Sequence, residues 1–126
     1  MLHPAKYAEL LAEKIRFAAP RLDWVTGVTG ELSGEEAATP AHWRRHLREP
    51  VRFAAALKTL HLQGCNIFLE VGPQPRLITL GQACLPEGAG RWVASLRSDR
   101  PEWEQLFDAL GELYVTGLPV DWQGVD

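Results

Sequence analysis

Apolar residues recur along this chain in two patterns, helical stripes and short continuous runs, and the two patterns alternate. The most regular stripe predicts a helix over 101–116, because apolar side chains fall three or four positions apart at Trp103, Leu106, Phe107, Leu110, Leu113 and Tyr114. Similar spacing predicts helices at 5–18, 41–47, 51–63 and 75–84. Runs rich in apolar and β-branched residues predict strands at 23–28, 66–71 and 92–96.

This alternation predicts an α/β fold, a small parallel sheet flanked by helices. We expect the first two strands to be buried and parallel, because the connection between them contains helical segments long enough to form a crossover. The polar stretch 31–39 is expected to be a surface loop, and Thr39, which precedes a proline, to cap the next helix. Ser98 or Asp99 is expected to cap the last helix, and the tail 118–122 to run extended.

Composition narrows the class of protein. The chain has 126 residues, 46% hydrophobic and 23% charged, which suffices for one core. A net charge of −3 argues against nucleic acid as a partner, and no apolar run approaches the length of a membrane span. Cys65 and Cys84 lie inside apolar patterns, which is typical of small buried residues in a reducing compartment. We therefore expect a cytoplasmic protein.

The strand at 66–71 runs directly into Gly72 and Pro73, with a further proline at Pro75 and a helical pattern after it. Proline and glycine end a strand sharply, and the carboxyl ends of parallel strands are where open α/β sheets hold their ligands. A small α/β domain that binds a ligand beyond this turn is one interpretation of the chain.

Several segments occur in an order that points to one family. They are Val25-Thr26-Gly27-Val28-Thr29-Gly30, Trp43 to Phe53 (sequence WRRHLREPVRF), Gly64 to Pro73 (GCNIFLEVGP), Leu96-Arg97, Leu113 to Gly117 (LYVTG) and Val120-Asp121-Trp122. In these segments the sequence resembles the C-terminal part of the acyltransferase domain of modular polyketide synthases. The resemblance covers nearly the whole chain and implies the C-terminal portion of the acyltransferase, an α/β-hydrolase-like fold.

The resemblance also implies an activity and a division of the chain. Such an acyltransferase loads malonyl-type units from acyl-CoA onto its own serine and passes them to the phosphopantetheine arm of an acyl carrier protein. Residues 1–97 would be acyltransferase, and 98–126 would be the linker that runs back toward the ketosynthase. Met1-Leu2-His3-Pro4 is similar to the residues that follow the family's catalytic His-Ser pair. The catalytic Ser and His would then lie upstream, the isolated chain would be inactive, and its partners would be that upstream part, the ketosynthase and the carrier protein.

The one site residue that the resemblance assigns to this chain is His46. In the family a backbone carbonyl four positions before a helix-opening proline orients the catalytic histidine, and here that proline is Pro50. The carbonyl accepts the imidazole Nδ1–H, so that Nε2 faces the serine. The alternative is that residues 45–50 form only a joint between two helices. No cofactor is expected on the chain itself.

Other residues favour structural interpretations. His42 and His46 have the i, i+4 spacing of a zinc pair but no third ligand beside them, so we expect no metal site. Carboxylates at 99–104 are stabilised at a helix start without any catalytic duty. Arg44, Arg45, Arg48 and Arg52 are interpreted as a solvated face or as a site for an acidic carrier. The alternative to an acyltransferase is a non-catalytic docking module, in which Trp103 and Trp122 contact neighbouring domains.

Overall fold

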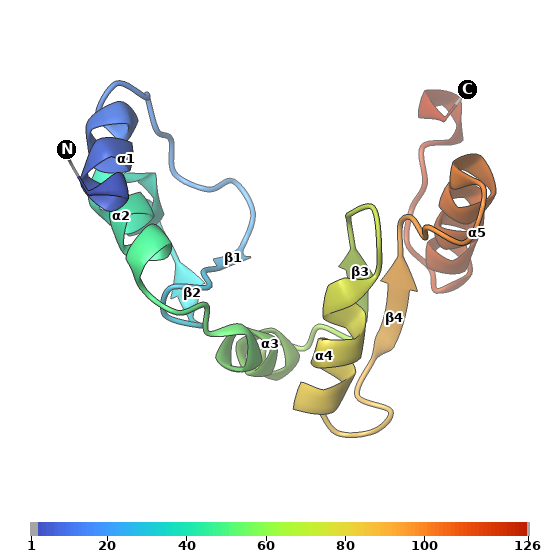
Figure 1. Ribbon diagram of the computed structural model, residues 1–126. Helices are drawn as coiled ribbons and strands as arrows, with labels where there is room; N and C mark the ends of the chain where they lie inside the picture. Colours follow the sequence, from blue (N-terminus) through green and yellow to red (C-terminus); the bar gives the residue numbers. More distant parts are fainter. Residues whose placement is uncertain (1–2, 126) are drawn as a thin grey trace. The chain divides into compact units, whose positions relative to one another are not determined.

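A computed structural model describes residues 3–125, without the side chains of residues 5, 8 and 9. The chain divides into two compact units, Met1–Gly64 and Cys65–Asp126, which appear in blue to green and in yellow-green to red in Figure 1. The fold is a mixture of helices and short strands with a small parallel sheet, as the sequence predicts. No helix among residues 3–125 is long and apolar enough to cross a membrane.

The first unit is a helical layer with a small hairpin. Its elements are α1 (Pro4–Ala12), β1 (Trp24–Val25), β2 (Leu32–Ser33), the 3₁₀ turn η1 (Glu35–Ala38), α2 (Pro40–Arg48) and α3 (Phe53–Leu62). Helices α1 and α2 pack side by side. Thr39 caps α2 as predicted, since its Oγ1 accepts a hydrogen bond from the amide of His42 at 3.3 Å and a proline fills the first helical position.

Two predictions for this unit were wrong. The first helix ends at Ala12 rather than near residue 18, and a turn follows in which the amide of Ile15 donates to the carbonyl of Ala12. Residues 23–28 do not join a parallel sheet. Only Trp24–Val25 is a strand, and it pairs antiparallel with Leu32–Ser33, inside the stretch that we expected to be a loop.

Side-chain and backbone hydrogen bonds explain why the strand is short. The hydroxyl of Thr26 accepts from the amide of Val28, and the amide of Gly30 donates to the carbonyl of Thr26, which closes a tight turn. Gly30 has a φ of +74°, and a Cβ placed there would lie 2.5 Å from the Cβ of Ala55 on α3. The hairpin turn is therefore pressed against α3, where only glycine fits.

The second unit is a βαβ arrangement followed by a helix. Its elements are β3 (Ile67–Glu70), α4 (Arg76–Cys84), β4 (Arg91–Ala94), α5 (Glu102–Val115) and the 3₁₀ turn η2 (Trp122–Gly124). Strands β3 and β4 are parallel, and the rings of Phe68 and Trp92 stack with centroids 4.4 Å apart. Val93 is the most deeply buried large side chain of this unit, at 2% exposure, and α5 packs against β4.

The strand predicted at 66–71 is present and parallel, but it is not buried on both faces. Leu69 is 45% exposed and Val71 is 81% exposed. Within this unit the sheet has two strands, so each strand has one hydrogen-bonded neighbour. The apolar side chains that predicted a buried strand are therefore only partly covered by the described residues of the second unit.

The N-cap of helix α5 and the tail that follows the helix differ from the prediction. Its N-cap is Pro101, which makes no side-chain cap, so neither Ser98 nor Asp99 serves as the cap. At its end Gly117, at φ +95°, donates to the carbonyl of Tyr114, and Leu118 donates to that of Leu113. The tail then closes into η2 instead of running extended through residue 122.

Candidate functional site: the end of helix α2

The candidate site is the C-terminal turn of α2. The helix ends at Arg48, and Glu49 is extended with a ψ of 148°. In an α-helix the carbonyl of His46 would accept from the amide of residue 50, but residue 50 is proline and has no N–H. The helix therefore leaves this carbonyl without its usual donor. The His46 carbonyl oxygen is therefore available to accept a hydrogen bond from a group outside the helix.

The side chain of His46 has a separate environment. Its ring lies 5.7 Å from the ring of Trp43, and Trp43 also stacks with Phe17 and Trp24 at 6.5 and 6.1 Å. An open apolar hollow of about 440 Å³ lies here, lined by Leu11, Ala12, Ile15, Phe17, Trp43, His46 and Leu47. The imidazole thus belongs to an aromatic cluster between α1 and α2, and nothing in its surroundings requires a catalytic imidazole.

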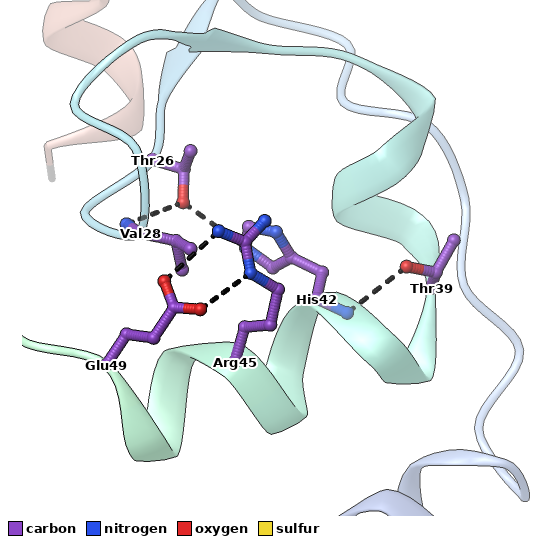
Figure 2. A network of polar contacts seen from close by, with 6 residues as sticks. All are labelled: Thr26, Val28, Thr39, His42, Arg45 and Glu49. Carbon is purple, nitrogen blue, oxygen red and sulfur yellow. Dashed lines mark hydrogen bonds and ion pairs between the residues drawn. The ribbon is translucent and has the colours of Figure 1, made fainter.

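His42 is a structural histidine. It is 6% exposed, and its Nε2 lies 3.3 Å from the hydroxyl of Thr26, as Figure 2 shows. Burial, and then the positive charges of His46 and Arg45, hold the pKa of His42 below its usual value. Because Nε2 pairs with Thr26, it is committed to linking α2 to the hairpin. Among residues 3–125 no three potential metal ligands gather.

Arg45 and Glu49 form an ion pair on the other side of α2, also shown in Figure 2. Arg45 Nε and Nη2 donate to the two carboxylate oxygens of Glu49 at 2.9 and 3.1 Å. This pairing raises the pKa of Arg45, and the Arg45 hydrogen bond, with Arg52 nearby, lowers the pKa of Glu49. The pair spans the last turn of α2, so it braces the residues on both sides of His46.

The turn after β3 has a different role from the ligand site that its position suggests. The carboxylate of Glu70 reaches over the turn and accepts hydrogen bonds of 2.9–3.0 Å from the first three amides of α4, those of Arg76, Leu77 and Ile78. Ser95, which directly follows β4, also holds this turn, because its Oγ accepts a hydrogen bond from the amide of Gly72 at 3.1 Å. A carboxylate of the chain itself therefore occupies the place where an anionic ligand would bind.

Glu70 was missed by the sequence analysis. Its position offered a signal, because an acidic residue ends an apolar strand and is joined to a helix by a short Gly-Pro turn. His46 was assigned by resemblance. Of the segment expected to follow a catalytic pair, Met1 and Leu2 lie outside the described residues.

Comparisons with known proteins show what the chain is related to. No protein-family model matches it. It is 40% identical to polyketide synthase GfsA of Streptomyces halstedii over 115 residues, 89% of this chain. It is 37% identical to the mycoketide-CoA synthase of Mycobacterium tuberculosis over 115 residues, 91% of this chain. It superimposes on the acyltransferase domain from the second module of the salinomycin polyketide synthase with a TM-score of 0.86 and 34% identity, over 94% of its length.

The chain is homologous to polyketide synthase acyltransferase domains. A second solved relative, the acyltransferase domain of SpnD, agrees with a TM-score of 0.77 and 30% identity over 89% of this chain. The chain spans only 2% and 3% of the two curated synthases and 28% of each of the two solved acyltransferase chains. The expected fold, a portion of the acyltransferase fold with a small parallel sheet flanked by helices, is thereby confirmed.

Proposed function

We propose that the chain is the C-terminal part of an acyltransferase that loads malonyl-type units from acyl-CoA onto an acyl carrier protein. Its homology to synthase acyltransferases supports this assignment, and so does its sequence, which lacks the family's Gly-His-Ser-x-Gly turn. The nucleophilic serine and the catalytic histidine would come from an upstream part of the same protein. Residues 1–97 would belong to the acyltransferase and 98–126 to the linker toward a ketosynthase, in a cytoplasmic synthase.

The observation that carries the proposal is the carbonyl of His46, to which Pro50 offers no hydrogen. In the complete site this oxygen accepts the Nδ1–H of the catalytic imidazole, which leaves Nε2 able to take the serine proton. The serine oxygen then attacks the thioester carbonyl, and the CoA thiolate leaves with that proton. In the second half-reaction the thiol of the carrier's phosphopantetheine attacks the acyl-serine in the same way. The chain itself needs no cofactor for its part.

The experiment uses the complete protein and measures self-acylation with labelled malonyl-CoA. His46→Ala is expected to keep the rate within about tenfold, because an alanine carbonyl can orient the base equally well. Leu47→Pro is expected to lower the rate about a hundredfold or more, because proline disfavours the helical conformation of the residue before it and re-aims the His46 carbonyl. Leu47→Ala is the matched control, since it removes the same side chain and leaves the backbone free.

Two outcomes would contradict the proposal. If His46→Ala abolishes self-acylation while circular dichroism shows an intact fold, the imidazole itself acts, and the carbonyl role falls. If Leu47→Pro and Leu47→Ala have equal rates, the direction of the His46 carbonyl is irrelevant to the chemistry.

A specific observation favours a second candidate, a docking module. Trp103 is 68% exposed and Phe107 is 51% exposed, and their rings lie 6.0 Å apart on α5. Exposed aromatic pairs are typical of protein interfaces. The two candidates differ in one measurement. An upstream part that self-acylates at full rate in the absence of residues 1–126 would favour docking alone.

A further inference from the structure

Helix α2 presents its arginines on a single face. Ala41, Arg44, Arg45 and Arg48 follow one another at i, i+3, i+4 and i+7, so they share one side of the helix. They line, with Glu49, an open hollow of about 490 Å³. The opposite side carries Trp43, His46 and Leu47, which line the apolar hollow beside α1. We call Arg44, Arg45 and Arg48, together with Arg52 at the start of α3, the arginine face.

The charge of this face differs from that of the chain. Four arginines and one carboxylate, Glu49, lie within residues 44–52, whereas the whole chain has a net charge of −3. Arg52 joins the group electrostatically, because its charge contributes to the lowered pKa of Glu49. Glu49 is already paired with Arg45, and the exposed Arg48 and Arg52 add two further positive charges to the face. A positive patch on an acidic protein steers acidic partners to one place.

The arginine face is also held in position. The buried His42 links α2 to the hairpin through Thr26, and the Thr39 cap fixes the first turn. The bidentate Arg45–Glu49 pair braces the last turn. A partner therefore meets a preformed surface, and little ordering of the backbone is needed when it binds.

We propose that the arginine face is the docking surface for an acidic surface of the acyl carrier protein. This inference rests on the proposed acyltransferase function and adds the place where the second substrate binds. Three of its four arginines lie on the same helix as the His46 carbonyl, and an α-helix is only about 10–12 Å across with its side chains. A carrier docked here holds its flexible arm within one helix diameter of the group that orients the base. The carboxylates of the carrier surface, rather than the phosphates of CoA, are the ligands.

The test compares two double variants of the complete protein that change the total charge equally. Arg48→Glu with Arg52→Glu reverses two exposed arginines of the face, and Arg16→Glu with Arg21→Glu reverses two exposed arginines of the first unit outside it. For each protein, transfer to the carrier protein and to N-acetylcysteamine, a small neutral thiol, is measured after loading with malonyl-CoA. Arg48→Gln serves as a milder variant if the double reversal does not fold.

We expect the ratio of carrier transfer to thiol transfer to fall about tenfold in the face variant at 50 mM salt. Exposed charges act mainly by steering the encounter between the two proteins, and the small neutral thiol is not steered. The fall should narrow at 0.5 M salt, where charges are screened within a few ångströms. The control pair should keep the ratio. Arg48→Gln should show a smaller fall with the same salt dependence.

Several outcomes overturn the inference. One is a ratio that changes less than twofold, and another is a fall that salt does not narrow. A rise in the KM for malonyl-CoA equal to the rise for the carrier would mean that the face binds CoA phosphates instead. Failure of the proposed function is a different result, because the unaltered complete protein would then show no self-acylation with malonyl-CoA.

Discussion

The carboxylate of Glu70 is the feature of the second unit whose removal has the most direct consequence. It accepts hydrogen bonds from the first three amides of α4, which have no partner within the helix. Loss of a capping side chain costs about 0.5–2 kcal/mol, and loss of a negative charge at a helix N-terminus costs about 0.3–1 kcal/mol. Glu70→Ala should therefore destabilise α4 by about 2 kcal/mol. Glu70→Gln, which keeps one acceptor oxygen, should cost about half as much.

The assay is amide hydrogen exchange of the peptide 76–84 in the complete protein. A loss of about 2 kcal/mol corresponds to about thirtyfold faster exchange, because each 1.4 kcal/mol is about tenfold in an equilibrium constant. Glu87→Ala is the matched control, since this carboxylate is exposed in the loop after the same helix. If Glu70→Ala changes exchange by less than twofold, or no more than Glu87→Ala does, the capping argument is refuted.

Three further predictions follow from single features. Burial lowers the pKa of His42, so the unfolded chain takes up a proton at a higher pH than the folded chain does. The free energy of unfolding should therefore fall as the pH drops below about 6.5, by at most about 1.4 kcal/mol per pH unit. Urea unfolding of His42→Gln should lose this pH dependence. Gly30→Ala should cost about 1–3 kcal/mol more than Gly88→Ala in thermal unfolding, because both have similar positive φ but only Gly30 faces Ala55. The isolated chain should show no mass increase after incubation with malonyl-CoA, and an adduct of malonyl mass on it would contradict the proposed division of the site.

Most helices could be predicted because local signals mark their ends. The predicted helix 75–84 is observed at Arg76–Cys84, and 101–116 at Glu102–Val115. The segment 23–28 failed because its β-forming residues are interrupted by a hydroxyl that bonds back to the chain. Thr26 accepts from the amide of Val28, and this local bond competes with strand pairing. A strand-propensity scale considers only the type of each residue, so it cannot include this competition between hydrogen bonds.

The candidate site shows a similar division between local and tertiary information. The role of Glu70 depends on a turn that brings the strand end to the helix start, so residue type alone does not reveal it. The place of His42 depends on Thr26, which is sixteen positions away and reaches it only through the hairpin. Both residues are polar groups whose partners are set by the tertiary fold, and the sequence pattern predicts the elements but not these pairings.

The role proposed for the His46 carbonyl shows why such a site is difficult to recognise from residue types. Any amino acid supplies a backbone C=O, so the chemistry places no demand on the side chain at position 46. The demand falls on Pro50 instead. A proline there withholds the i+4 hydrogen, ends α2 and directs the chain into α3, and all three effects follow from its ring. If the proposed role holds, its sequence signal is a proline four residues downstream, at a break between two helices.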